Sequence, residues 1–264
     1  MESFNVGPSE FCFKDGAVLE SWTISMAGGN KREVLASLPG GGECGCRALA
    51  FSWNGAGANG ESNCVENIGR SFFGAPEKFD GEFRVKFAQR KARLPSSDFS
   101  PEGFYAEYLF EEFAFELGIG LFNATETRVP WDAGADIFFK VPWHSGCTRQ
   151  NYRVLHDARS VYGLGENGKL RMLELGSDLS EAGDVVLAKL KSAMVKIGLK
   201  SGEEDITVRI GDGKRPSPGM CVILGEREGA FKIGVRVRCP ALGKSGRFVE
   251  PGQEACLNLR VSLE

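Results

Sequence analysis

The sequence has few of the residues, and none of the motifs, that mark the commonest catalytic sites. Its 264 residues include 2 histidines, and neither a GxxxxGK[ST] phosphate-binding loop nor a GxSxG nucleophile elbow is present. The formal net charge is −3 because 32 basic and 35 acidic residues are interspersed, without a basic tail. These absences exclude the commonest nucleotide hydrolases and α/β-hydrolases, and they argue against nucleic-acid binding through a basic tail.

Membrane and secretion signals are missing as well. No apolar run approaches the roughly 20 residues that cross a bilayer, and the first residues, MESFNVGPSEF, lack the basic and apolar regions of a secretory signal. The 8 cysteines are scattered and lack the dense spacing of a disulfide scaffold. We therefore expect cytoplasmic synthesis without classical secretion, reduced thiols and no membrane partner.

Glycine and phenylalanine, in contrast, are abundant. The chain has 35 glycines and 19 phenylalanines, a mixture that favours short strands joined by tight turns. Residues 81–87, 230–239 and 255–264 alternate between apolar and polar, as strands with one buried face do. No composition shift or internal repeat divides the chain. We predict a single β-rich domain over residues 1–264, mainly antiparallel and of sandwich or jelly-roll type.

Two segments carry signals for helices within this β-rich chain. Residues 180–197, SEAGDVVLAKLKSAMVKI, place apolar residues at helical spacing, and Gly198 follows as a stop signal. Near 101–111, Ser100 can cap a short helix that Pro101 opens. We therefore predict an amphipathic helix near 180–197 and a short helix near 101–111, the latter followed by a strand.

Both histidines lie in one stretch, GADIFFKVPWHSGCTRQNYRVLHD, which makes it the first place to look for an active site. His144 and Cys147 stand in H-x-x-C spacing, and a thiolate with a nearby imidazole is the minimum for nucleophilic acyl chemistry. Catalytic cysteines and their histidines usually come from distant segments, however, so a loop histidine beside an inert thiol also fits. The candidate catalytic residues are His144, Cys147 and His156.

A metal site is a second candidate. Cys44 and Cys46 form a C-x-C in a glycine-rich loop, and together with His144 and Cys147 they could supply four zinc ligands. The paired C-x2-C signature is missing, and a C-x-C also occurs without a metal. Cys44 and Cys46 are therefore the candidate metal ligands. We expect no cofactor, because GLGENGK at 163–169 fits a hairpin turn better than a dinucleotide site.

Carboxylates are a third source of candidates, since they can act as general acids or bases. The sequence alone gives neither their separations nor their surroundings, so it does not assign a role to any of them. The four carboxylates noted are Glu111, Glu112, Asp132 and Asp136.

The segment DIFFKVPWHS, followed by YRV, resembles a strand of the jelly-roll coat proteins of picornavirus-like viruses. The resemblance implies a shell subunit and makes a virion a compatible location. Together with the missing catalytic motifs, it favours a non-enzymatic structural protein that contacts protein subunits in a larger assembly or homo-oligomer. The alternative is a soluble enzyme or small-ligand-binding protein that uses a pocket containing His144, Cys147 and His156.

Overall fold

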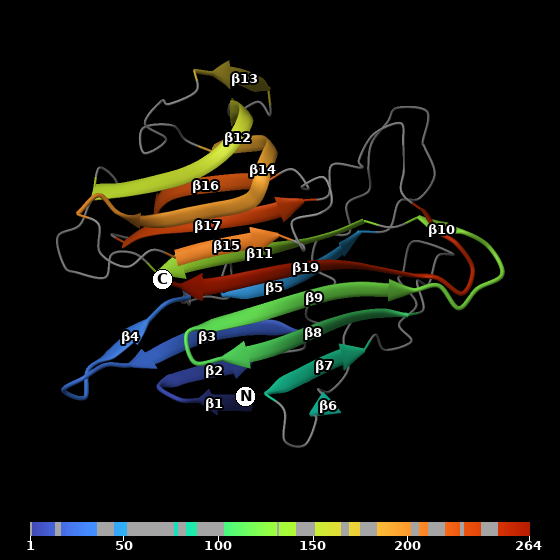
Figure 1. The fold of residues 1–264 in the computed structure, drawn as a ribbon, viewed down its shortest axis with the longest axis horizontal. Coiled ribbons are helices and arrows are strands. Elements are labelled where there is room, and N and C mark those ends of the chain that lie inside the picture. The colour runs from blue at the N-terminus through green and yellow to red at the C-terminus, as the bar shows by residue number, and fades with distance from the viewer. Residues whose placement is uncertain are drawn as a thin grey trace.

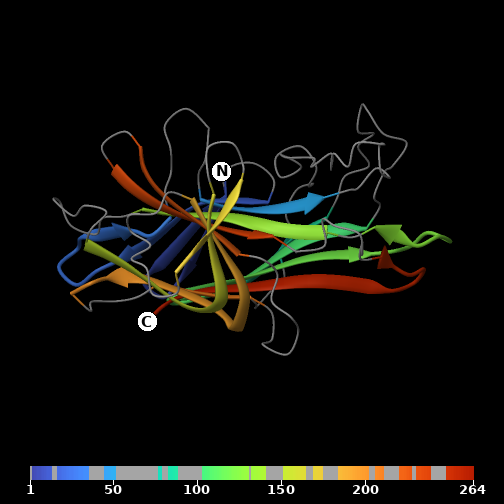
Figure 2. The same ribbon diagram turned by 90° about the horizontal axis from the view of Figure 1, so that it is seen from above.

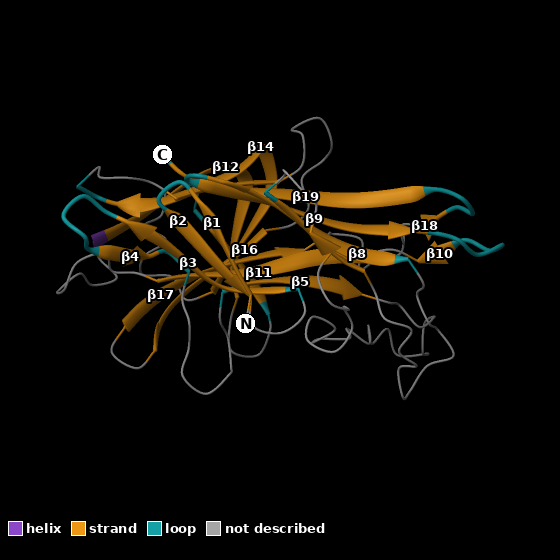
Figure 3. Ribbon diagram, turned by 90° about the horizontal axis from the view of Figure 1, so that it is seen from below, coloured by secondary structure: helices purple, strands orange, loops and turns teal. Residues whose placement is uncertain are grey.

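The computed structural model describes residues 2–13, 17–35, 45–51, 77–78, 83–88, 103–130, 132–140, 151–164, 169–174, 184–201, 206–210, 220–227, 230–238 and 248–264. Nearly all of these residues belong to antiparallel strands or to the turns between them (Figures 1 and 3), and no α-helix occurs in these ranges. Nor does any helix with the length and apolarity to cross a membrane occur there. The β-rich, mainly antiparallel class predicted from the sequence is confirmed.

Seventeen strands form one hydrogen-bonded sheet, and two short strands, β10 and β18, pair separately. The strands are β1 (Glu2–Val6), β2 (Ser9–Phe13), β3 (Val18–Ser25), β4 (Lys31–Glu33), β5 (Cys46–Phe51), β6 (Glu77–Lys78), β7 (Arg84–Ala88), β8 (Phe104–Glu111), β9 (Ala114–Phe122), β10 (Val129–Pro130), β11 (Asp132–Lys140), β12 (Tyr152–Leu164), β13 (Leu170–Leu173), β14 (Asp184–Leu199), β15 (Ile206–Ile210), β16 (Met220–Arg227), β17 (Ala230–Arg238), β18 (Phe248–Val249) and β19 (Glu254–Leu263).

The sheet passes from one layer to a second layer through the long strand β14. The first half of β14 pairs with β16, which continues through β17 and β11 to β5. The second half pairs with β15, which continues through β19 and β9 to β8 and β7. Seen from above, β5 and β19 accordingly lie in different layers (Figure 2).

The bend in β14 has a local cause. Lys189 and Ala193 have positive backbone φ angles of 56° and 52°, which are uncommon for residues with a side chain. Between them, the N–H groups of Lys191 and Ser192 donate to the carboxylate of Asp157, at 2.9 and 2.7 Å. Asp157 lies where the register of β12 against β14 shifts, so this side chain binds the turned backbone of the neighbouring strand.

The helix predicted near 180–197 is wrong, because the described residues 184–199 form β14. Val185 and Leu187 face the core before the bend, and Val195 and Ile197 face it after the bend. The bend shifts the phase of the strand alternation, so apolar residues also fall at the spacing of three and four that is typical of a helix. Residues 180–183 lie outside the described ranges.

The short helix predicted near 101–111 is wrong as well. Residues 104–111 form β8, with Ala106, Tyr108 and Phe110 directed into the core. The predicted strand that follows is confirmed as β9, which pairs with β8 as a hairpin. Aromatic residues on a half-buried strand outweighed the capping signal of Ser100 and Pro101, which lie outside the described residues.

Aromatic side chains dominate the core where β2, β3 and β8 meet. The rings of Phe11 and Phe110 are stacked with centroids 4.4 Å apart, and Trp22 stacks on Phe11 at 5.5 Å. All three are at most 2% exposed, and the Trp22 indole N–H donates to the Ser9 hydroxyl oxygen at 3.0 Å. This packing anchors β3, the neighbour of β5, and so supports the strand that faces β11.

Candidate functional site

Residues 134–139 of strand β11 are buried on both faces of the strand. Ala135, Ile137 and Phe139 point into the core between the layers and are 0% exposed. Asp136 and Phe138 alternate with them and therefore face away from that core, yet they are only 1% and 4% exposed. A carboxylate buried outside the apolar core needs charged or hydrogen-bonding partners, so this outward face of β11 is the place to look for a polar site.

Arginines occupy the positions opposite Asp136 on both neighbouring strands. The register pairs Asp136 with Arg47 on β5 and with Arg236 on β17. Residues directly opposite each other in an antiparallel pair share one face of the sheet. The central row, defined by these register positions as residues 47, 136 and 236, combines segments that are far apart in the sequence.

The same face continues along and across the neighbouring strands. On β17 this face includes the positions of Lys232, Gly234 and Arg238, because each lies an even number of residues from Arg236. On β16 the residue opposite Arg236 is Cys221, and Val186 on β14 lies opposite Cys221. Three basic residues of β17 thus hold register positions on the strand next to Asp136.

A glycine fixes the junction between β5 and β11. The backbone N–H of Phe138 donates to the carbonyl oxygen of Gly45 at 2.9 Å. Gly45 has a φ of 61°, and a Cβ at this position would overlap the carbonyl oxygen of Leu19. Only glycine meets both conditions, so Gly45 helps to set the register that places Arg47 opposite Asp136.

The structure places His156 away from this face. His156 lies on β12 opposite Val195, a core residue, so it faces the interior between the layers. Its Nδ1 accepts a hydrogen bond from the N–H of Ala158 at 3.2 Å, and burial lowers the pKa of the imidazole. His156 thus supports the irregular segment of β12 from the side of the sheet that faces the core.

His144, Cys147 and Cys44 lie outside the described residues, so the pocket and the zinc site predicted from the sequence stay predictions. Cys46 is described and is 0% exposed on β5, where burial raises the pKa of its thiol. In the part of the chain that the structure describes, no group of three or more His, Cys, Asp or Glu side chains could hold a metal ion.

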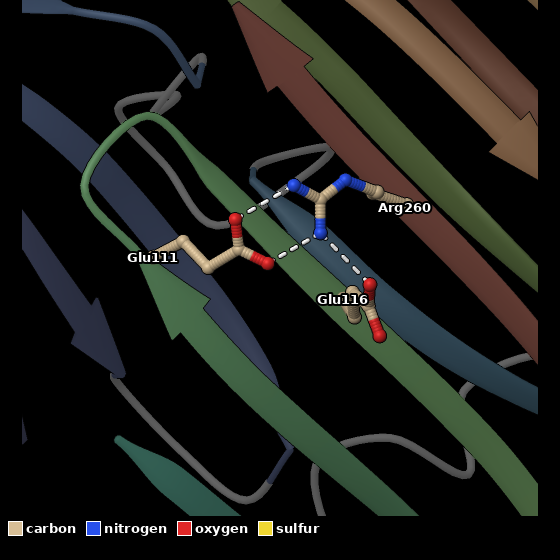
Figure 4. A network of polar contacts seen from close by, with 3 residues as sticks. All are labelled: Glu111, Glu116 and Arg260. Atoms are coloured by element: carbon tan, nitrogen blue, oxygen red, sulfur yellow. Dashed lines mark hydrogen bonds and ion pairs between the residues drawn. The ribbon is translucent and has the colours of Figure 1, made fainter. Parts of the chain in front are cut away.

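A second polar cluster lies on the opposite, outer surface of the molecule. An open hollow of about 660 Å³ is lined by residues of the β8–β9 turn, β15 and the end of β19. The Arg260 guanidinium donates to the carboxylates of Glu111 and Glu116 there (Figure 4), at 2.6 Å for Nη2 to Glu111 and 2.8 Å for Nη1 to Glu116. Because the one guanidinium gives both carboxylates a hydrogen-bond partner, the cluster accounts for local stability better than for ligand binding.

Sequence reasoning noted Asp136 among four carboxylates but did not distinguish it from the others. One signal was available: Asp136 stands in the otherwise apolar segment ADIFF. A charged residue inside a strand that is buried on both faces requires partners. Those partners come from residues 47 and 236, and their pairing depends on a long-range register that a sequence does not reveal.

Comparisons with known proteins complete the description. No family model and no curated protein matches the chain. A galactose mutarotase related enzyme from Lactobacillus acidophilus is similar in structure, with 12% identity, a TM-score of 0.72, and coverage of 100% of this chain and 97% of that one. A galactose mutarotase-like protein from Lactobacillus casei gives 16% identity, a TM-score of 0.72 and 100% coverage of both chains. An aldose epimerase homologue from C. elegans has 10% identity and a TM-score of 0.63, with coverage of 99% of this chain and 98% of that one.

These likenesses correct the function predicted from the sequence. The viral coat-like, capsid-forming structural protein is wrong, because the whole chain is similar in fold to a galactose mutarotase related enzyme and to a galactose mutarotase-like protein, over 97% and 100% of those chains. The resemblance of DIFFKVPWHS to a coat-protein strand reflects an apolar strand that ends near a proline, a pattern that unrelated β folds share. The alternative, an enzyme or small-ligand-binding protein, agrees better with the findings. The chain has the fold of the galactose mutarotase-like proteins.

Proposed function

We propose that the protein acts on an aldose as a 1-epimerase, interconverting the α and β anomers on the outward face of β11. The observation that carries the proposal is the buried Asp136, with arginines at the register positions opposite it on β5 and β17, on a fold whose structural relatives are named for this activity. A fold alone does not imply an activity, so the argument depends on what these residues can do.

Anomer exchange needs two proton transfers. A base removes the proton from the hydroxyl on C1 while an acid protonates the ring oxygen, and the bond between C1 and the ring oxygen breaks. After rotation about the C1–C2 bond, the same transfers run in reverse and close the ring on the other face of the carbonyl. A positioned carboxylate suits the role of base, and we assign that role to Asp136.

The arginines opposite Asp136 cannot supply the acid. A guanidinium stays protonated in proteins, so Arg47 and Arg236 can donate hydrogen bonds to sugar oxygens without releasing a proton. An imidazole is the usual group for this transfer. His144 follows β11 in the sequence, a few residues after Asp136, and we propose it as the acid. Of the pocket predicted from the sequence, His144 is thus part of the proposed site, and Cys147 follows it in H-x-x-C spacing.

The experiment is the rate of mutarotation of freshly dissolved aldoses, followed by polarimetry and by NMR exchange between anomers. The protein is expected to accelerate the exchange of at least one aldose, and Asp136→Asn is expected to lower the acceleration about 100-fold or more. Glu107→Gln is the matched control, because Glu107 lies on the outer surface of β8, 3.7 Å from Arg84. The absence of acceleration for every aldose in the panel would overturn the epimerase assignment.

A second candidate is carbohydrate binding without turnover. It is favoured by the residues of the row, because the two arginines opposite Asp136 do not release a proton. This candidate predicts that an aldose binds in ligand-detected NMR while its anomers exchange at the uncatalysed rate. Asp136→Asn would then weaken binding without any kinetic effect.

Two expectations on organisation accompany the proposal. We propose that residues 1–264 act as one domain, which is supported by the pairing of β19 with β9 and β15 and by the coverage of full-length relatives. A homo-oligomer or another protein partner stays a prediction, and the native mass of the purified chain would test it.

A further inference from the structure

Two carboxylate side chains are buried in the part of the chain that the structure describes, Asp136 and Glu20. Glu20 is 9% exposed, against 1% for Asp136. It lies on β3, far from Asp136 in the sequence, and the proton transfers proposed above do not use it. Burying a carboxylate costs free energy that only polar contacts offset, so Glu20 is the next candidate for contact with a ligand.

The strand pairing places Glu20 on the same side of the sheet as Asp136. β5 lies between β3 and β11, and its residue 47 is opposite both Val18 and Asp136. Residues opposite each other share one face of an antiparallel sheet, so Val18 is on the outward face with Asp136. Glu20 follows Val18 by two residues and therefore points to that face as well.

A bulge in β3 supports this direction. Leu19 and Trp22 both face the apolar core, with two residues between them. The register against β2 passes from Leu19 directly to Ser21, so Glu20 is the extra residue of the bulge. Glu20 and Ser21 therefore both lie on the side away from the core.

Gly45 is the residue between Glu20 and β11. A Cβ on residue 45 would lie 2.9 Å from the Cα of Glu20, which shows how closely β3 approaches at this point. On its other side, the carbonyl oxygen of Gly45 accepts the N–H of Phe138, the outward residue next to Asp136 on β11. Because glycine has no side chain, residue 45 places none between Glu20 and the outward face of β11.

The spacing of the two carboxylates fits the two ends of one sugar ring. From Asp136 to Glu20 the path crosses two strand spacings, about 10 Å, and two residues along the strand, about 7 Å, so the Cα atoms lie about 12 Å apart. The Asp and Glu side chains extend into this interval from its two ends. A pyranose ring with a hydrogen bond at each end spans what remains.

We infer that Glu20 determines the specificity of the proposed site by binding the hydroxyl group on C4, the ring carbon opposite C1. The inference rests on the proposed function, in which Asp136 acts at C1. A carboxylate offers about four acceptor sites, so Glu20 can keep its present contact and also accept from a sugar hydroxyl. Because both carboxylates are shielded from water, the site discriminates against a sugar that lacks this hydroxyl.

The test combines two forms of the protein with two kinds of sugar. Anomer exchange is measured for D-glucose, D-galactose and 4-deoxy-D-glucose, which is the 4-deoxy analogue of both hexoses. The wild-type chain is expected to favour one hexose over the deoxy sugar by about tenfold or more in kcat/KM, because the deoxy sugar leaves the buried carboxylate without a donor. Glu20→Gln is expected to reduce this preference to about threefold or less, mainly by raising KM for the hexose.

The preference separates contact with the sugar from a structural role. If Glu20 only stabilised the bulge, Glu20→Gln would slow both sugars equally and leave their ratio unchanged. Glu20→Asp keeps the charge on a shorter side chain and is expected to recover part of the preference. Glu10→Gln is the matched control, because Glu10 lies on the neighbouring strand β2, is 37% exposed and is 3.2 Å from Lys31. Circular dichroism checks that each variant keeps its sheet.

The outcomes distinguish this inference from the proposed function. Equal kcat/KM for hexose and deoxy sugar in the wild-type chain would overturn the inference even if Glu20→Gln did not fold, and it would leave the epimerase standing. An unchanged preference in a folded Glu20→Gln would do the same. Acceleration of other aldoses but of neither hexose would also overturn recognition at C4. Acceleration of no aldose at all would overturn the proposed function and this inference together.

Discussion

Arg260 holds the carboxylate of Glu111 through both terminal nitrogens of its guanidinium, which joins the end of β8 to β19 across β9. One of these nitrogens also donates to Glu116 on β9 at 2.8 Å. The hydrogen bonds from Arg260 lower the pKa of Glu111 below its ordinary value of 4.5. Three strands of one layer are thus tied together by one side chain.

Arg260→Met should destabilise the protein by about 1 kcal/mol near neutral pH, because it leaves Glu111 and Glu116 as neighbouring unpaired carboxylates. The side chains of Arg260, Glu111 and Glu116 are 34%, 45% and 46% exposed, so solvent screening keeps the loss below that of a buried pair. A carboxylate with a depressed folded pKa stabilises above its ordinary pKa, and this contribution disappears as the pH falls through the folded value.

Urea unfolding at about pH 7 and about pH 3 measures the effect. The difference between wild type and Arg260→Met should shrink at the lower pH. Arg209→Met is the control, expected to cost a few tenths of a kcal/mol, since Arg209 is 55% exposed and 3.5 Å from Glu264. A difference that stays constant with pH would mean that packing of the arginine stem, and not its charge, stabilises the layer.

His156 should make the stability fall on mild acidification. Burial lowers the pKa of His156 in the folded state, so the unfolded chain takes up this proton first as the pH decreases. The folded state loses stability from the ordinary histidine pKa of about 6.5 downward, until the folded imidazole is protonated too. We expect His156→Asn to flatten the stability between about pH 7 and about pH 5. Asparagine can keep an acceptor for the Ala158 N–H. A pH slope of the unfolding free energy that stays unchanged in His156→Asn would mean that the protonation of His156 is unrelated to folding.

The strands of the fold were visible in the sequence wherever the alternation kept its phase. Residues 255–264 alternate without interruption and form β19 almost to the residue, and β9 follows the same rule. β14 was mistaken for a helix because its bend at Lys189 and Ala193 converts a spacing of two into spacings of three and four. That bend depends on Asp157, which belongs to another strand, so no local pattern signals it.

The candidate site was less accessible to sequence reasoning than the strands. His144, Cys147 and His156 attracted attention because they are rare residues close together in sequence. The row around Asp136 forms only when β5, β11 and β17 pair in one register. A register shift of one residue would change which residues lie opposite Asp136, so the site is a property of the long-range pairing.

The thiol of Cys46 should be among the slowest to react in the folded protein. It is 0% exposed, and burial raises its pKa, so little thiolate is present at neutral pH. Iodoacetamide labelling followed by peptide mass mapping should find Cys12 and Cys256 modified before Cys46, since their side chains are at least partly exposed. In denaturant the three rates should converge.

The same property bears on a zinc site at Cys46, because a metal ligand must be the thiolate. Elemental analysis of protein purified without chelator should find no stoichiometric zinc. A stoichiometric metal that Cys46→Ser removed would contradict this expectation, and it would show that Cys46 leaves the core in the metal-bound protein.

Gly45→Ala should be the most damaging single-methyl change near the candidate site. The new Cβ would overlap the carbonyl oxygen of Leu19, and the φ of 61° is unfavourable for alanine. Backbone strain and overpacking together should cost about 3 kcal/mol or more. Gly252→Ala is the control, because Gly252 also has a positive φ, 70°, but open space around it, so strain alone should cost about 1 kcal/mol.

The Gly45 variant should also lose aldose exchange. Because the Gly45 carbonyl accepts the N–H of Phe138, the substitution should disturb the register of Arg47 against Asp136, whereas the Gly252 variant should keep it. Urea unfolding and the mutarotation rate, measured on both variants, test the two effects, and equal losses of stability in the two variants would contradict the steric role of Leu19.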